Sequence, residues 1–150
     1  MIRLPDYEDF VFLGENLREE DKTEITEQTG RTDYVQALFT AYRSSSESYV
    51  NANGTPGVIF GILPHDQHSM VIWASGTEDI VKRKLEFCKT TKWVLNKWFE
   101  TYPVDYFFNF THSKNTVHHD WLRFMGADLG PPLPYGVNRE LFLPFMIKRK

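Results

Sequence analysis

Histidines next to acidic residues are the first candidates for chemistry in this sequence. The segment from His65 to His68 holds two histidines around an aspartate, and His118 and His119 directly precede Asp120. Imidazole nitrogens and carboxylate oxygens are common ligands of zinc and other divalent metals. Neither spacing matches an established metal motif, and adjacent histidines on a helix point about 100° apart. We therefore expect no metal site.

The only cysteine is Cys88, which we expect in the core. One thiol cannot form an intrachain disulfide or build a thiolate metal site alone, which indicates a reducing compartment. The first residues contain no apolar leader, and no apolar run approaches the roughly 18 residues that a membrane span requires. We expect neither ordinary secretion nor a membrane-spanning segment.

Length and composition describe a folded globular chain. At 150 residues, the sequence is long enough for one sizeable core, so we expect a single domain over 1–150. Its residues are 41% hydrophobic and 15% aromatic, which excludes intrinsic disorder as the main state.

The charge is slightly negative and unevenly distributed. A net charge of −3 and a pI near 5.9 argue against nucleic acid as the partner. Residues 1–30 carry 3 basic and 9 acidic side chains, whereas residues 121–150 carry 5 basic and 2 acidic ones. Opposite poles of this kind favour encounter with a protein partner or head-to-tail packing between copies.

The first half of the sequence predicts helices followed by a hairpin. Asn53-Gly54 between two strand-like runs is a strong hairpin signal, because both residues tolerate positive φ. Leu17, Asp21 and Ile25 recur near helical spacing in an otherwise polar, acidic stretch, which predicts an exposed helix. The expected elements are a strand at 9–13, helices at 17–29 and 33–43, and strands at 48–52, 58–63 and 70–74.

The second half predicts a crossover helix between two strands. The helix should run over 77–100 with an apolar side made of Val81, Leu85, Cys88, Leu95, Trp98 and Tyr102. A strand at 105–110, a helix at 116–125 capped by Asn115, a proline-rich loop at 130–136 and a strand at 140–147 should follow. Pro144 should place the last strand at an edge or a bulge. The order β-α-α-β-β-β-α-β-α-β is a mixed α/β sheet arrangement.

This order of elements resembles the GNAT acetyltransferase fold. Residues 108–127 (FNFTHSKNTVHHDWLRFMGA) resemble the strand, asparagine, short helix and closing glycine that GNAT proteins place beside the acetyl-CoA arm. The segments LREED, GVIFGILP, IWASGT, NTVHHDWLRFMGADLG and LPFMIKR also resemble a protein family of short-tailed phages. Members of that family are described as internal virion protein A or as acetyltransferases.

The resemblance implies where acetyl-CoA would bind. Enzymes of the GNAT family carry an Arg/Gln-x-x-Gly-x-Gly/Ala turn whose N–H groups hold the pyrophosphate. The corresponding turn here has one glycine, no basic residue, and two acids, Glu78 and Asp79. If acetyl-CoA binds at all, the implied residues are Trp73, Ala74, Ser75, Gly76, Thr77 and Asn115.

The catalytic positions that the resemblance implies are also changed. GNAT enzymes often use a tyrosine four residues before the closing glycine as general acid, and Leu122 stands there. They often use a glutamate on the fourth strand as base, and the expected strand at 70–74 has none. Tyr135 and His118 or His119 are the side chains that would have to substitute.

Two functions from different classes follow. The first is a phage virion-associated or assembly protein that keeps the fold, has lost catalysis, needs no cofactor and binds a phage or host protein. The alternative is an acetyl-CoA-dependent N-acetyltransferase that modifies a host or phage protein. Either would be found in the virion or in the host cytoplasm.

Overall fold

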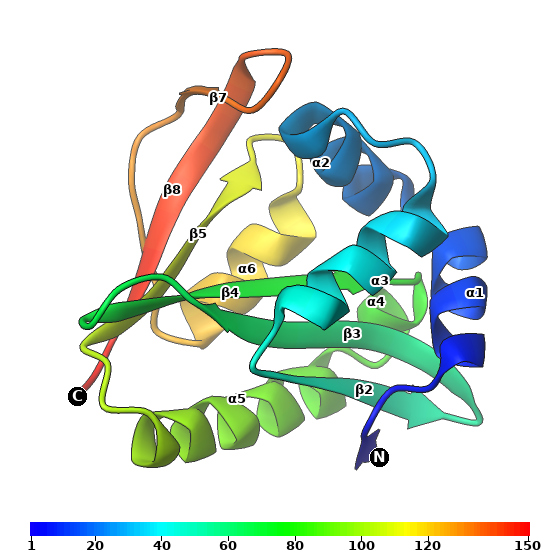
Figure 1. The fold of residues 1–150 in the computed structure, drawn as a ribbon, viewed down its shortest axis with the longest axis horizontal. Coiled ribbons are helices and arrows are strands. Elements are labelled where there is room, and N and C mark those ends of the chain that lie inside the picture. Colours follow the sequence, from blue (N-terminus) through cyan, green and yellow to red (C-terminus); the bar gives the residue numbers. More distant parts are fainter.

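A mixed sheet of eight strands organises the computed structural model, which describes residues 1–150 (Figure 1). Its order is β1-β2-β3-β4-β5-β8-β6, and β7 also pairs with β8. The strands are β1 Ile2–Arg3, β2 Glu47–Asn53, β3 Thr55–Pro64, β4 Ser69–Gly76, β5 Tyr106–His112, β6 Asp128–Leu129, β7 Leu133–Tyr135 and β8 Glu140–Lys148. The helices are α1 Tyr7–Asn16, α2 Glu19–Thr29, α3 Tyr34–Ser44, α4 Asp79–Lys82, α5 Lys84–Thr101 and α6 Thr116–Phe124.

Helices cover both faces of the sheet and create two hydrophobic clusters. One cluster packs α5 and α6 against the sheet, and the other packs α1 and α3 against β2 and β3. Figure 1 shows α5 below the central strands and α3 above them. No helix is both long and apolar enough to span a membrane.

The sheet opens into a fork between β4 and β5, its only parallel pair of neighbours. These strands pair from Ser69 to Val71 of β4, and their ladder ends there. The side chain of Asn109 then replaces the next backbone rung, because its Nδ2 donates to the carbonyl oxygen of Ile72 at 2.8 Å. Beyond this bond the strands diverge, which leaves room for a cavity between their carboxyl ends.

The predictions for α2, α3, the β2–β3 hairpin, β4, β5, α6 and β8 are confirmed within a few residues. Gly54 has φ 79° in the hairpin, as the Asn-Gly pair predicts. The strand predicted at 9–13 is wrong, because α1 occupies it. Asp6 and Asp9 form a capping box at its start, and Phe10 and Leu13 are buried on one helical face.

The single helix predicted at 77–100 is interrupted. Arg83 has φ −118° and ψ 40°, which separates the four-residue α4 from α5. The interruption changes which side faces the core. Val81 and Leu85 are 45% and 73% exposed, whereas Ile80 and Phe87 are buried. Sequence periodicity cannot register this change of phase, since no glycine or proline marks it.

The proline-rich segment contains a short strand, β7, which pairs with β8. The residues of β7 lie within the predicted loop at 130–136 and pair with Glu140–Phe142. The last strand is therefore not an edge strand, as it pairs with β5 on its other side. Pro144 lies opposite the gap between β6 and β7, where its missing N–H is not needed for pairing.

Two predictions about the polar side chains near α2 and α6 are wrong. Asn115 precedes α6 but makes no capping bond. Its fully buried side chain donates from Nδ2 to Oδ1 of Asp21 at 3.0 Å and accepts from Nη1 of Arg18 at 3.3 Å. Helix α2 is not simply exposed and acidic either, because Asp21 is 1% exposed and Glu24 is mostly covered.

The loop between β7 and β8 packs on α2, which gives a matched stability test. Gly136 and Gly54 have φ values of 81° and 79°, so alanine brings similar backbone strain to both. Only at Gly136 would a Cβ overlap the carbonyl oxygen of Glu27, whereas at Gly54 nothing lies within 4 Å. We predict that Gly136→Ala lowers the free energy of unfolding by about 1–3 kcal/mol more than Gly54→Ala. Equal losses in urea unfolding would show that the loop does not pack on α2.

Asn115 should be tested by two substitutions that separate a cap from a buried hydrogen-bonding group. We predict that Asn115→Ala lowers the free energy of unfolding by about 1–3 kcal/mol, because Asp21 and Arg18 each lose a buried partner. Asn115→Asp should be no better, since it faces Asp21 with a second carboxylate. Asn96, exposed on α5, supplies the control Asn96→Ala, which should cause no loss. Full stability of Asn115→Asp in urea unfolding would restore the cap interpretation.

Candidate functional site

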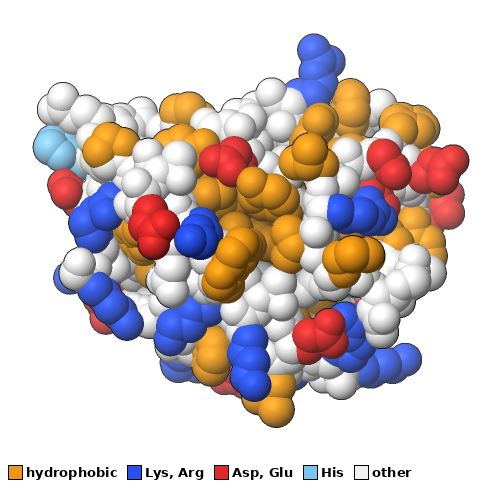
Figure 2. Space-filling model, turned by 90° about the horizontal axis from the view of Figure 1, so that it is seen from below, with side chains coloured by type: hydrophobic (Ala, Val, Ile, Leu, Met, Phe, Trp, Pro, Cys, Tyr) orange, Lys and Arg blue, Asp and Glu red, His pale blue; other side chains and the backbone are white.

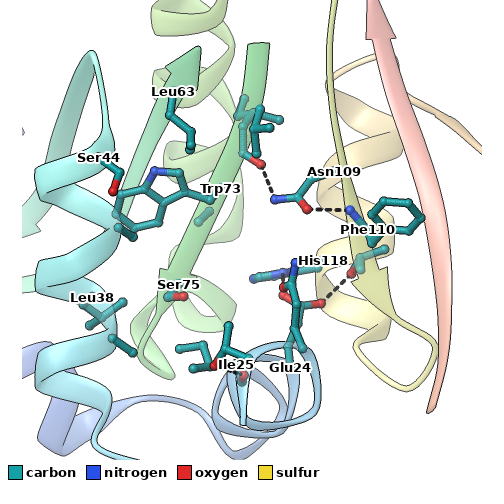
Figure 3. A pocket seen from close by; sticks show the side chains of 18 of the residues that line it. Glu24, Ile25, Leu38, Ser44, Leu63, Trp73, Ser75, Asn109, Phe110 and His118 are labelled. Atoms are coloured by element: carbon teal, nitrogen blue, oxygen red, sulfur yellow. Dashed lines mark hydrogen bonds and ion pairs between the residues drawn. The ribbon is translucent and has the colours of Figure 1, made fainter. Parts of the chain in front are cut away.

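A cavity of about 320 Å³ lies in the fork between β4 and β5 (Figure 3). Helices α2 and α3 form its outer walls, and α6 closes its inner end. Thirteen of its 23 lining residues are hydrophobic, among them Ile25, Leu38, Leu63, Trp73, Phe110 and Leu122. A mostly apolar concave site with a few polar groups is the usual form of a ligand site.

Only three of the six residues that the resemblance implied for acetyl-CoA binding line the cavity. Trp73, Ala74 and Ser75 line the cavity. The indole Nε1 of Trp73 donates to Oγ of Ser45 at 2.8 Å, which fixes the ring against α3. The other three, Gly76, Thr77 and Asn115, do not line it.

A network of buried charged side chains lies at the α6 end of the cavity. The ring of His118 stands between two carboxylates, with Nε2 3.1 Å from Oδ1 of Asp21 and Nδ1 3.4 Å from Oε2 of Glu24. The guanidinium of Arg18 reaches Oδ1 of Asp21 at 3.4 Å, and the same oxygen accepts from Asn115. Glu24 and His118 also line the cavity, and Figure 3 shows their side chains together.

The surroundings shift the pKa of each member of this network. Burial raises the pKa of Asp21, and the nearby charges of His118 and Arg18 only partly oppose it. Burial would also raise the pKa of Glu24, but the hydrogen bond and charge of His118 and the N–H of His112 outweigh it and lower that pKa. Burial disfavours the charged form of His118, yet Asp21 and Glu24 prevail and raise its pKa.

These contacts restrict what the network can do chemically. Oε1 of Glu24 already accepts from the Thr111 hydroxyl at 2.9 Å and from the His112 N–H at 2.6 Å. A carboxylate held by several donors is a weak general base. Both ring nitrogens of His118 face carboxylates, which leaves neither for a substrate. The arrangement ties α2 to α6 and places mutually paired charges at the floor of the cavity, but it does not present an acid and a base to a reacting group.

Asp21, Glu24 and His118 also form the only group of three potential metal ligands that the structure brings together, within 4.8 Å. Their chemistry does not call for a metal, because the protein supplies its own cation. Arg18 lies beside Asp21, and a divalent ion there would meet its charge at close range. His65 and His68, considered as metal ligands from the sequence, do not come together in one site. His65 and His68 make separate exposed contacts with Asp66 and Asp105.

The possible catalytic substitutes lie in different surroundings. Leu122, at the position of the family tyrosine, lines the cavity. Tyr135 does not line it and instead stacks on Phe110 with ring centroids 3.8 Å apart. His119 bonds through Nε2 to the carbonyl oxygen of His112 at 2.9 Å. Of the proposed substitutes, only His118 reaches the cavity.

Most backbone N–H groups of the turn after β4 already donate hydrogen bonds within the chain. The N–H groups of Gly76 and Thr77 donate to Asp21 and to the carbonyl of Gly57. Those from Asp79 to Arg83 donate to acceptors within the turn and α4. Between 76 and 83 only the N–H of Glu78 has no partner in the chain. The usual orphan donors of a helix start are therefore almost all satisfied here.

The sequence interpretation missed Arg18, Asp21 and Glu24 as site residues. A signal for Asp21 was present, since it stands between Leu17 and Ile25 on one helical face. An acidic residue in an apolar stripe indicates a buried partner, because a charge is not buried alone. Two partners of Asp21 are distant in the sequence: His118 lies on α6, and Asn115 lies just before α6, 94 residues from Asp21. No local pattern identifies them.

Comparisons with known proteins place this architecture among solved acetyltransferases. No protein-family model matches the sequence, and no curated protein matches it. A GNAT-family acetyltransferase from Bacillus anthracis aligns at a TM-score of 0.70, with 11% identity over 97% of this chain and 91% of that one. A ribosomal-protein-alanine N-acetyltransferase from Brucella melitensis aligns at 0.68, with 16% identity over 97% of each chain.

A third neighbour is a small-molecule enzyme. The aminoglycoside acetyltransferase AAC(6')-Ib, solved with ribostamycin and coenzyme A, aligns at a TM-score of 0.72, with 14% identity over 99% of this chain and 93% of that one. At such identities the likeness concerns the fold and not the activity. The chain has the mixed α/β fold of the GNAT acetyltransferases over nearly its whole length.

Proposed function

We propose that this chain is a catalytically degenerate protein of the acetyltransferase fold that acts by binding a protein partner, as a virion-associated or assembly protein of a short-tailed phage. Two lines of support differ in kind. The phage setting rests on the sequence resemblance, from LREED at 17–21 to LPFMIKR at 143–149. The loss of catalysis rests on the geometry at the end of β4.

The single observation that carries this proposal is the engagement of the backbone donors between 76 and 83. A pyrophosphate is held by several N–H groups that point at it from a loop and a helix start. Here one such donor, that of Glu78, is unengaged. An anion would also meet the carboxylate of Glu78, which is unfavourable by about 0.3–1 kcal/mol, whereas the carboxylate of Asp79 is paired with Arg83 at 3.2 Å. This segment does not fit a pyrophosphate.

Helix α2 adds a second obstacle on the side of β4 that faces away from β3. The N–H of Arg18 donates to the carbonyl oxygen of Gly76 at 3.0 Å, and Oδ2 of Asp21 accepts from the N–H of Gly76 at 2.9 Å. Both backbone groups of the last residue of β4 are thus bonded to the start of α2. An extended cofactor arm along β4 would have to displace these bonds and uncover Arg18 and Asp21, which are buried.

The cavity remains available to a partner. Its apolar walls suit a protruding side chain with a long aliphatic part. A protein that keeps its fold but lacks the reacting groups can still bind a partner, because function resides in the site and not in the fold. A partner segment seated here would cover Trp73 and Phe110.

The alternative is an acetyl-CoA-dependent N-acetyltransferase. It is favoured by one observation, the placement of Trp73, Ala74 and Ser75 on the wall of a cavity at the β4–β5 fork. In this interpretation Glu24 would have to exchange its contacts with Thr111, His112 and His118 to hold the amine of the acceptor. The chain would also need to free the N–H donors of the turn after β4. The two candidates therefore differ in whether coenzyme A binds.

Calorimetry with acetyl-CoA and with CoA separates the two candidates. We predict no saturable heat for the purified chain, because the donors that would hold the pyrophosphate are engaged. The variant Glu78→Gln/Asp79→Asn tests whether charge alone is responsible, and it too should fail to bind. A dissociation constant in the low micromolar range for acetyl-CoA, with displacement by CoA, would favour the enzyme.

The virion role requires a separate measurement. We predict that antibodies to this chain detect it in purified phage particles or their precursors after density-gradient separation. The control is a known non-structural phage protein carried through the same gradient. A chain that stays in the cleared lysate and never co-sediments with particles would contradict the virion role.

A further inference from the structure

The large hydrophobic side chains exposed on this molecule form three groups and are not scattered. They are Met1, Leu4 and Tyr7 at the start of the chain, Val81, Leu85, Trp93 and Phe124 on α4 to α6, and Leu133, Val137 and Leu141 around the β7–β8 loop. Clustered exposed apolar side chains mark interaction surfaces more often than single ones do. The first two groups also differ in charge.

The basic ridge is the outer line of α5, formed by Leu85, Lys89, Trp93 and Lys97. These residues recur every four positions, which places them along one side of the helix. Leu85 and Trp93 are 73% and 60% exposed, and Lys89 makes no ion pair. Lys97 lies 5.6 Å from the centre of the Trp93 ring and pairs with the exposed Glu100 at 3.5 Å, so a partner carboxylate would compete with Glu100 for it. Figure 2 views the molecule from below, the side on which α5 lies, and shows Lys and Arg side chains beside hydrophobic ones, with acidic side chains among them.

The acidic ridge is the outer line of α1, formed by Tyr7, Glu8, Phe12 and Glu15. Tyr7 is 67% exposed, Glu8 and Glu15 are exposed, and Phe12 is half-buried. Neither glutamate makes an ion pair within the chain. Leu4, just before α1, is 73% exposed and adds to the apolar part of the acidic ridge. This surface combines apolar anchors with uncompensated negative charge.

We propose that the basic ridge of one copy of this chain binds the acidic ridge of another copy. The charges match in sign and in spacing. Glu8 and Glu15 lie seven residues apart on either side of Phe12, which is about 10 Å along the helix. Lys89 and Lys97 lie eight residues apart on either side of Trp93, which is about 12 Å. The contact would bury Trp93 and Leu85 against Tyr7 and Phe12 while it pairs the charges.

The two ridges lie on different sides of the molecule. Helix α1 packs on one face of the sheet and α5 on the other, as Figure 1 also shows. One copy can therefore use both ridges at once. A contact between unlike surfaces is heterologous and generates a ring or an open filament. This inference does not depend on the absence of catalysis.

A second copy of the chain has the properties that a partner of the basic ridge needs. A positive surface with exposed aromatic and aliphatic side chains needs an anionic partner with apolar contacts. The acidic ridge has both properties and is present at the same concentration as the basic ridge. Nucleic acid or an anionic membrane would satisfy the charge, but neither accounts for the exposed Tyr7 and Leu4 on the opposite surface.

The test uses two variants that each block one ridge. Lys89→Glu/Trp93→Ala removes the basic ridge and leaves the acidic one, while Tyr7→Ala/Glu8→Lys does the reverse. In sedimentation velocity at low salt, the unmodified chain should show a mass that rises with concentration and falls when salt is added. Each variant alone should stay monomeric. Their equimolar mixture should form a heterodimer that does not grow further.

Several outcomes would overturn the proposal. An unmodified chain that stays monomeric at the highest soluble concentration excludes the contact. Dimerisation of Tyr7→Ala/Glu8→Lys alone would show a symmetric contact between basic ridges. Association of the unmodified chain with single-stranded DNA or phosphatidylglycerol vesicles, without self-association, would assign the basic ridge to those partners. Lys89→Arg, which keeps the charge, should associate as the unmodified chain does, and matching thermal unfolding shows that both variants are folded.

Discussion

The buried bonds among Arg18, Asp21, Asn115 and His118 are the constraint on which the rest of the structure depends. They join the start of α2 to the start of α6 across the open end of the β4–β5 fork. Burying such charges is costly, and removing one partner of a buried pair costs about 3–5 kcal/mol, because the other charge is left uncompensated. The members must therefore be kept together. Only Nε of Arg18 lacks a partner among them.

This network also determines the character of the cavity. Because Asp21 and Arg18 bond the backbone of Gly76, α2 is held close to the last residue of β4. The same placement brings Glu24 to the floor and Ile25 to the wall. A site that holds a cofactor between the two strands needs those backbone groups to be available. The same contacts thus place α2 on the wall of the cavity and engage both backbone groups of Gly76.

Much of the fold could be predicted because its signals are local. Asn53-Gly54 requires positive φ and marks the hairpin, and the apolar spacing after Tyr34 marks α3. The errors occur where local signals are ambiguous or absent. Four apolar and aromatic residues at 10–13 fit a strand or a buried helix turn, and the capping box of Asp6 and Asp9 decides for the helix. The interruption at Arg83 has no local signal.

The candidate site was harder to predict than the fold. Trp73, Ala74 and Ser75 reach the cavity because they follow the part of β4 that pairs with β5. The family resemblance singled them out for acetyl-CoA binding, which stays a prediction. Asn115 was assigned a capping role from its position, which is a sound local rule that a stronger tertiary interaction overrides. The role of Asp21 depends on a residue 94 positions away. Local periodicity could show that Asp21 faces inward, but not what it would meet.

The likeness to acetyltransferases and the saturated turn after β4 are compatible, because they concern different levels of structure. TM-scores near 0.7 at 11–16% identity reflect the shared fold, which hydrophobic patterning and strand pairing maintain. Cofactor binding depends on a few N–H groups and on the charge beside them. Glu78 and Asp79 place carboxylates in that turn, and the bonds of α2 to Gly76 engage one backbone donor and one acceptor, while the hydrophobic core of the sheet is separate from both. The contacts that maintain the fold are therefore separate from those that would hold a cofactor, and a likeness in fold leaves the occupant of the cavity undetermined.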